Sequence, residues 1–306
     1  MTGVFEGFAT IAILIVLGIL LAHLGVIDVA GQRTLSTLAF FVASPALLLT
    51  VLESSDLTDV FSGALIATTA AVVVTAAVFL VVAVVRRQPL GDTVIGTLCS
   101  SYVNAGNLGL PIAAYVLGDT ALVAPVLLLQ LLFLQPLALV LLDADASSSR
   151  LSLRTIVMRP FTNPITIGSL IGVVLALTDI SLPGAIHDPL ELVGGMAVPS
   201  MLIAYGVSLR LGPLPGRGVP PGELGFVVGL KMLVQPLAAY AVGRFVLDLD
   251  TSALLAVTVL SALPTAQNVF VIASRYERAT LLARDAIFIS TLASVPVVML
   301  ITALIA

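Results

Sequence analysis

Residues 99–111 read Cys99-Ser-Ser-Tyr-Val-Asn-Ala-Gly-Asn-Leu-Gly-Leu-Pro111 and lie inside one of the long apolar runs of this chain. Within that run stand two amides and three helix-breaking residues: Asn104, Gly106, Asn107, Gly109 and Pro111. A proline inside a helix removes a backbone hydrogen bond and costs on the order of 3 kcal/mol. In lipid, the freed backbone groups need protein partners or a water-lined cavity. The stretch therefore predicts a broken membrane helix whose polar residues face away from lipid.

The composition of the whole chain indicates an all-α polytopic membrane protein. Of its 306 residues, 59% are hydrophobic and 10% are charged, and the mean hydropathy is +1.18. A soluble domain carries roughly 25% charged residues. Runs of about 20 apolar residues, enough to span a bilayer, predict ten transmembrane helices: 5–26, 33–52, 60–85, 93–117, 120–142, 162–179, 189–210, 224–246, 252–274 and 285–305. The net charge of −4, without a basic run, gives no indication of nucleic-acid binding.

The basic residues predict the orientation of these spans. Eleven of the thirteen fall in alternate loops: Arg33, Arg86, Arg87, Arg150, Arg154, Arg159, Arg210, Arg217, Arg275, Arg278 and Arg284. Basic loops of membrane proteins stay in the cytoplasm. We therefore expect a multi-pass protein of the cell (plasma) membrane with both termini extracytoplasmic. Residues 143–159 would form its longest cytoplasmic linker.

The two halves of the chain resemble each other. Gly18-Ile-Leu-Leu-Ala22 matches Gly172-Val-Val-Leu-Ala176 at an offset of 154 residues. Pro45 matches Pro199 at the same offset, and Asn107 matches Asn268 at 161. Residues 1–142 and 160–306 are thus predicted to form two five-helix repeats. Because five is odd, the second repeat must be inverted, which is typical of secondary transporters.

The second half contains its own broken helix, Ser261-Ala-Leu-Pro-Thr-Ala-Gln-Asn-Val-Phe270. Two broken helices, spans 4 and 9, would cross at their breaks and present half-helix N-termini that suit an anion. Candidate substrate-binding residues are Asn104, Asn107, Thr265, Gln267 and Asn268, and candidate helix-crossing residues are Gly109, Pro111 and Pro264. The alternative is that these polar residues only hold helices together, as asparagine and serine do in many bundles.

These residues also resemble those of a known family. The stretch from Asn104 to Pro111 fits the pattern Asn-x4-Gly-hydrophobic-Pro of the auxin efflux carrier family, which includes the plant PIN-formed proteins. Leu263-Pro264, followed by Phe270, resembles the ninth helix of that family. The likeness covers nearly the whole chain, and its most specific part is the motif in span 4.

The resemblance implies the fold of the bile acid/sodium symporters, with spans 4 and 9 crossing at Pro111 and Pro264. It implies a scaffold of spans 1, 2, 6 and 7, a moving transport unit of spans 3–5 and 8–10, an elevator-type motion and a homodimer. Asn104 corresponds to the substrate-contacting asparagine of the family. Because bacterial-type members are linked to malate, malonate and similar acids, the resemblance does not imply auxin as the substrate.

Three further residues are candidates for the scaffold wall or for coupling: Ser44, Tyr205 and Lys231. Lys231 is the only lysine of the chain and lies about seven residues, roughly 10 Å, inside span 8. We expect its side chain to snorkel to the inner interface. The alternative is a titrating or substrate-facing cation. Ser44 and Tyr205 fit simple packing equally well.

We therefore expect a secondary transporter of small organic anions, mono- or dicarboxylates, with no cofactor and no metal site. A sodium-coupled organic anion symporter of the bile-acid type is the alternative, although the crossing segments contain no carboxylate. An enzyme is not expected, because one cysteine and two distant histidines supply neither a nucleophile with its base nor a metal centre. A passive channel remains a further alternative, distinguished by single-channel currents.

Overall fold

The computed structural model describes residues 2–53, 63–109, 112–113, 117–118, 120–146, 164–178 and 180–305. The first half contains α1 (Thr2–His23), α2 (Val29–Leu38), η1 (Ala39–Ala43), α3 (Ser44–Glu53), α4 (Gly63–Val85), α5 (Leu90–Ser101), η3 (Ala105–Gly109), η5 (Thr120–Val123), α7 (Ala124–Leu129), η6 (Gln130–Leu134) and α8 (Gln135–Asp145). The second half contains α10 (Pro164–Thr178), α11 (Gly184–Gly194), α12 (Ala197–Leu211), α13 (Pro221–Gly229), η8 (Leu230–Val234), α14 (Gln235–Phe245), α15 (Thr251–Ser261), α16 (Asn268–Tyr276) and α17 (Thr280–Ile305).

Several of these helices join end to end into membrane-length rods. Six rods in the described part of the chain are long and apolar enough to cross a bilayer: Val29–Glu53, Gly63–Val85, Pro125–Asp145, Gly184–Leu211, Pro221–Phe245 and Thr280–Ile305. Their ends differ from the predicted spans by a few residues, and α8 continues to Asp145, into the predicted linker. These helices identify a multi-pass membrane protein.

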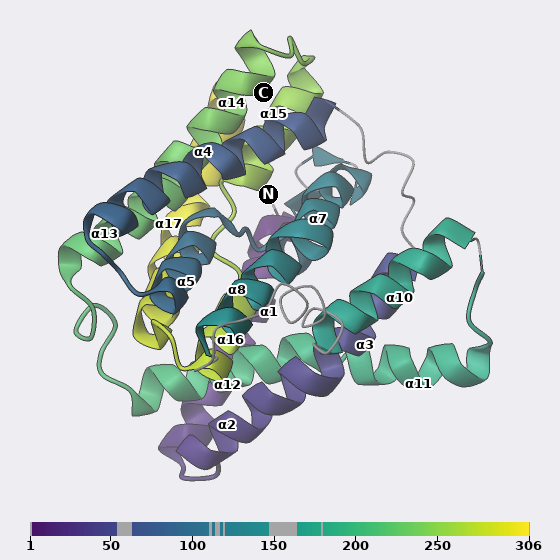
Figure 1. Ribbon diagram of the computed structural model, residues 1–306, viewed down its shortest axis with the longest axis vertical. Coiled ribbons are helices and arrows are strands. Elements are labelled where there is room, and N and C mark those ends of the chain that lie inside the picture. Colours follow the sequence, from purple (N-terminus) through teal and green to yellow (C-terminus); the bar gives the residue numbers. More distant parts are fainter. Residues whose placement is uncertain are drawn as a thin grey trace.

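The helices gather into two groups (Figure 1). In one group, which we call the α3–α12 group, α1 packs along α12, α10 packs along α3, and α2 and α11 complete the contacts. In the other, which we call the crossing group, α4 packs on α14, α5 packs on α8, and α17 contacts both α15 and α16. The two breaks that the sequence predicts both belong to the crossing group.

Glycines set the spacing inside the α3–α12 group. A methyl group at Gly18 of α1 would overlap the carbonyl of Ile203. The two helices approach equally closely at Gly206 of α12, where a methyl group would overlap the carbonyl of Ile15. A methyl group at Gly172 of α10 would lie 2.7 Å from the carbonyl oxygen of Leu49 and 2.9 Å from Cβ of Leu52. Any side chain larger than hydrogen would therefore force either helix pair apart.

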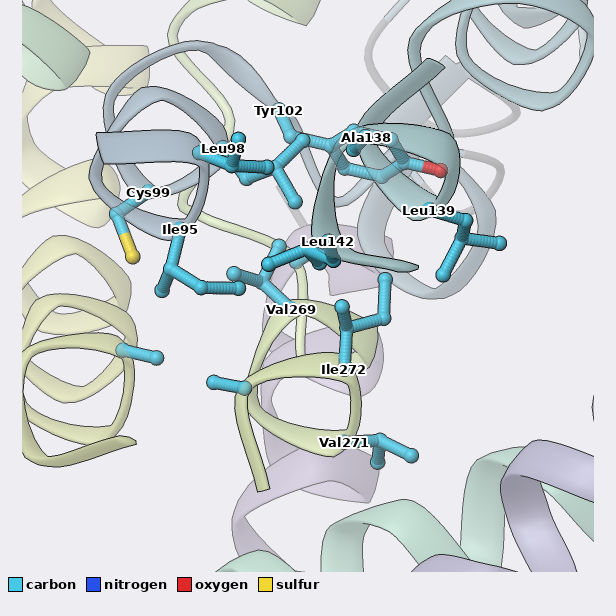
Figure 2. Close-up of a cluster of buried hydrophobic side chains, with 14 of the residues drawn as sticks. Ile95, Leu98, Cys99, Tyr102, Ala138, Leu139, Leu142, Val269, Val271 and Ile272 are labelled. Atoms are coloured by element: carbon cyan, nitrogen blue, oxygen red, sulfur yellow. The ribbon is translucent and has the colours of Figure 1, made fainter. Parts of the chain in front are cut away.

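The apolar core extends through both groups, and one part of it packs α5, α8 and α16 together beside the site. Figure 2 shows side chains of α5, α8 and α16 turned toward one another: Ile95, Leu98, Tyr102, Leu139, Leu142, Val269 and Ile272. All of them are buried. This core fixes α16 against α5 and α8, so that the breaks at the ends of α5 and α15 meet.

Candidate functional site

The two broken helices meet at their breaks through backbone hydrogen bonds. Val103 and Thr265 form an isolated antiparallel β-bridge. The amide of Asn104 donates to the carbonyl of Pro264 at 2.9 Å, and the amide of Ala266 donates to the carbonyl of Tyr102 at 3.2 Å. Pro264 has no N–H and disfavours helical backbone at the residue before it, so α15 ends at Ser261 and leaves an extended segment. The breaks therefore act as paired strands inside a helical bundle.

Side chains of the opposite break and of neighbouring helices satisfy the carbonyls that the breaks leave free. The Thr265 hydroxyl donates to the Cys99 carbonyl at 2.6 Å. The side-chain amides of Gln130 and Gln235 donate to the carbonyls of Val103 at 3.0 Å and Ser101 at 2.9 Å. Each donor side chain is buried. Since an unpaired carbonyl in lipid costs several kcal/mol, these bonds make the crossing tolerable in a membrane.

Lys231 belongs to the same set of donors, and its predicted snorkelling is wrong. Its side chain is fully buried in η8, with 0% of its surface exposed. Its amino group donates to Oε1 of Gln235 at 2.7 Å and to the carbonyl of Ser261 at 3.1 Å. The physical reason is the end of α15, whose terminal carbonyl offers the amino group a polar partner inside the protein.

A cavity of about 300 Å³, the crossing pocket, lies between the crossing and the α3–α12 group. Its polar side is formed by Tyr102, Asn104, Gln130, Gln267, Asn268 and the backbone of Gly106. Its apolar side comes mainly from α3 and α12: Leu47, Leu48, Val51, Val198 and Met201. Ligand pockets for drug-sized molecules span roughly 300–1,000 Å³, so this volume suits a small ligand.

The amides of the pocket form a hydrogen-bonded set. Nδ2 of Asn104 donates to Oε1 of Gln267 at 2.7 Å. Oε1 of Gln135 accepts from the Tyr102 hydroxyl at 2.9 Å and from Nδ2 of Asn268 at 3.1 Å. Oδ1 of Asn268 has no hydrogen-bond partner among the described residues. Asn104 and Gln267 come from opposite breaks, so one contact joins both halves of the chain at the pocket.

The polar groups of the pocket are uncharged amides and a hydroxyl, together with the start of one helix. None of the described residues that line it is charged. Gln267 and Asn268, at the start of the nine-residue helix α16, border the pocket. A helix N-terminus carries roughly half a positive charge, which favours an anion. Among the described residues, no group of three His, Cys, Asp or Glu side chains is placed to hold a metal ion.

Comparison with known proteins shows which family the chain resembles. The model of a family described as "Membrane transport protein" matches residues 3–146 and 138–302. This chain belongs to that membrane transport protein family. The match is consistent with the auxin efflux carrier resemblance of the sequence, which is thereby confirmed.

Two curated relatives cover nearly all of the transporter. A Rhizobium meliloti protein named "Putative malonate transporter" is 27% identical over 295 residues, which cover 93% of this chain and 90% of the relative. A Methanothermobacter thermautotrophicus protein named "Uncharacterized transporter" is 28% identical over 298 residues, 95% of each chain.

The structure places the predicted substrate-binding and crossing residues of the transporter in different positions. Asn104, Gln267 and Asn268 line the crossing pocket. Thr265 is buried behind it, bonded to Cys99 and to the Ser290 hydroxyl. The crossing residue Gly109 packs closely on Leu263 and Val123, and Pro264 accepts the bond from Asn104. Pro111 and the side chain of Asn107 lie outside the described residues.

The three remaining candidates do not line the described part of the pocket. Ser44 is half-buried at the start of α3, where η1 ends. Tyr205 of α12 lies farther along the helix, where its hydroxyl donates to the carbonyl of Arg284 at 2.8 Å. Lys231 bonds behind the crossing, as described above. Ser44 and Tyr205 therefore contribute to helix packing in this structure.

Sequence reasoning missed Tyr102 as a lining residue. It stands in the span-4 motif, two residues before Asn104, and the break turns its hydroxyl toward Gln135 of α8. Gln130 and Gln135 also reach the crossing, where they bond the Val103 carbonyl and the Tyr102 hydroxyl. Both carry a signal in the sequence, because they stand in a span that is otherwise apolar.

Proposed function

We propose that the transporter carries small organic anions, mono- or dicarboxylates, across the cytoplasmic membrane and binds them in the crossing pocket. The main observation in support of this proposal is the amide contact between Asn104 and Gln267 beside the N-terminus of α16. Amide N–H groups and a helix N-terminus are donors that recognise a carboxylate without a buried counter-charge. The name of the Rhizobium meliloti relative supports malonate as the first substrate to test.

The apolar side of the pocket supports a transport mechanism. The polar lining belongs to the crossing group, whereas α3 and α12 offer aliphatic side chains such as Leu47, Leu48 and Met201. A polar binding face that slides along an apolar wall breaks few hydrogen bonds as it moves. We therefore infer an elevator-type alternating access, with spans 3–5 and 8–10 moving against spans 1, 2, 6 and 7.

A 5+5 inverted repeat is part of the same proposal. Gly18 meets Ile203 and Gly206, and Gly172 meets Leu49 and Leu52. Each residue of one contact stands 154 positions from its counterpart in the other. This equivalence supports two related halves. The proposal adds opposite membrane orientation of the halves, both termini outside the cytoplasm, from the basic loops, and assembly as a homodimer, from the family that the sequence resembles.

The test is uptake of radiolabelled malonate into proteoliposomes. We expect saturable uptake by the unmodified protein and at least about a tenfold loss in Asn104→Ala, because a hydrogen bond to a charged group contributes about 1.5–3 kcal/mol. Gln88→Ala is the matched control, since the Gln88 amide bonds Glu223 away from the pocket. Full uptake in Asn104→Ala would remove the site assignment. Absence of malonate, malate and succinate uptake in the unmodified protein would remove the substrate class.

Uptake into the same proteoliposomes also tests the alternative function, a sodium-coupled symporter. Uptake at a fixed membrane potential is compared in sodium and in choline medium. Equal rates support the uncoupled or exchanging carrier. A rate that requires sodium supports the symporter and would place a cation beside the neutral oxygens of the crossing.

A further inference from the structure

A second polar cavity, of about 380 Å³, opens where the ends of α2, α12, α16 and α17 meet. We call it the arginine pocket, because Arg33 and Arg284 line it. It lies on the arginine-rich side of the protein, away from the crossing pocket. Arg33 is exposed at its rim, whereas only 1% of the surface of Arg284 is exposed.

The guanidinium of Arg284 is only partly used by its protein partner. Nε and Nη2 lie 2.7 and 2.6 Å from Oδ1 of Asp285, whose Oδ2 accepts from the amide of Gly216 at 2.8 Å. Nη1 has no hydrogen-bond partner among the described residues. It lies against Gly212, where a methyl group would overlap it, and Gly212 also lines the pocket. Arg284 and Gly212 both line the cavity, so the unpaired edge of the guanidinium is buried in its wall.

Two other features of the arginine pocket suit an anion. The Ser274 hydroxyl is a buried atom without a partner among the described residues, and Ser274 lines the cavity. Thr280 and Leu281, the first residues of the 26-residue helix α17, also line it, so the positive end of that helix faces the space. Glu277 is the one acidic residue among the described lining, and its side chain is exposed.

The same helices line both pockets in the same order. On α12, Met201 lines the crossing pocket and Ser208 lines the arginine pocket, with Tyr205 between them. On α16, Asn268 lines the first and Ser274 the second. Phe270 lies between these two, and its ring packs edge-on against that of Tyr205, with centroids 5.6 Å apart. This aromatic pair therefore lies between the residues that line the two cavities, and Phe270 is also part of the arginine-pocket wall.

From this arrangement, and resting on the function proposed above, we propose that the arginine pocket is a second carboxylate-binding site. A carboxylate there bonds Nη1 of Arg284 and the Ser274 hydroxyl, and the charge of Arg33 draws it in. It reaches the crossing pocket when the contact between Tyr205 and Phe270 opens. The site would collect dilute substrate on the arginine-rich side.

The test is binding of malonate to the purified full-length protein, followed by thermal shift in Asn104→Ala, in which the crossing pocket has lost a donor. We expect a saturable shift to remain in this variant. Adding Arg284→Gln should weaken it about tenfold or more, as loss of a hydrogen bond to a charged group does. An identical malonate response of the single and the double variant would overturn the second site.

Variants of surface arginines protect the test against misfolding of Arg284→Gln. In the Asn104→Ala background, Arg33→Gln should weaken malonate binding about threefold, since an exposed charge contributes little to binding. Arg210→Gln, whose arginine pairs with His23 outside the pocket, should leave binding unchanged. Equal effects of the two variants would contradict the proposal. A protein whose unmodified form shows no malonate response argues against the proposed function itself, so the two failures are distinguishable.

Discussion

The amino group of Lys231 lies 3.1 Å from the backbone carbonyl oxygen of Ser261, the residue at which α15 ends. A second bond, to Oε1 of Gln235 at 2.7 Å, connects it to the side chain that holds the Ser101 carbonyl at the other break. Lys231 of η8 thus contacts the end of one broken helix directly and the end of the other through Gln235. Lys231 reaches the crossing without lining the described part of the pocket.

We expect Lys231→Met to lower the free energy of unfolding by about 1–3 kcal/mol, because it leaves two buried oxygens without a donor. The thermal midpoint of the protein in detergent measures the loss. Arg244→Met is the matched control: Arg244 stands at the exposed end of α14, and we expect a change within about 0.5 kcal/mol. A midpoint as high as that of the control would show that the bonds to Ser261 and Gln235 contribute no stability.

Thr265→Val should destabilise the crossing although it keeps the shape of the side chain. The hydroxyl donates to the Cys99 carbonyl at 2.6 Å, and its loss leaves a buried carbonyl unpaired at a cost of about 1–3 kcal/mol. Thr265→Ser retains the donor and should lie much nearer the unmodified protein. Denaturant unfolding in detergent compares the two. Equal stabilities of the valine and serine variants would count against the hydrogen bond.

Gly206→Ala should separate α1 from α12. The added methyl group would overlap the carbonyl of Ile15 and approach Cα of Gly18 at 3.1 Å, and overpacking of this kind costs about 1–3 kcal/mol or more. Gly225→Ala in α13 meets nothing within 4 Å and should be neutral or stabilising by up to about 1 kcal/mol. Thermal midpoints of both variants check this. Similar midpoints for the two variants would mean that α1 and α12 can move apart without loss of stability.

Tyr102→Phe should weaken substrate binding more than it weakens the fold. The hydroxyl donates to Gln135 and accepts from Nδ2 of Asn268 at 3.4 Å, so its loss leaves the Asn268 amide, which borders the pocket, held by Gln135 alone. We expect KM for malonate to rise about two- to tenfold, as for loss of a neutral hydrogen bond. Tyr240→Phe, on α14, is the control. The dependence of uptake rate on malonate concentration separates KM from the maximal rate, and an unchanged KM would refute the expectation.

The sequence predicts the breaks well because their signals are local. Pro264 and the glycines around Asn104 stand out in apolar segments, and the 154-residue offset between Gly18 and Gly172 is visible in the amino-acid order alone. The same reasoning does not predict contacts between residues that are distant in the sequence. Nothing near Lys231 in the sequence indicates that its partner is Ser261, thirty residues away. The free edge of Arg284 depends likewise on Gly212, at the end of another helix.

The bond between Asn104 and Gln267 has a consequence for selectivity. Nδ2 of Asn104 already donates one of its two hydrogens to an amide oxygen at 2.7 Å. In the proposed site, a ligand that takes this hydrogen must offer a stronger acceptor than the amide that it displaces. Ionised acceptors form hydrogen bonds roughly twice as strong as neutral ones. A malonate ion meets that requirement, whereas its dimethyl ester, of nearly the same shape, does not. Discrimination between acid and ester would thus come from a competing internal bond, with no positive charge in the pocket.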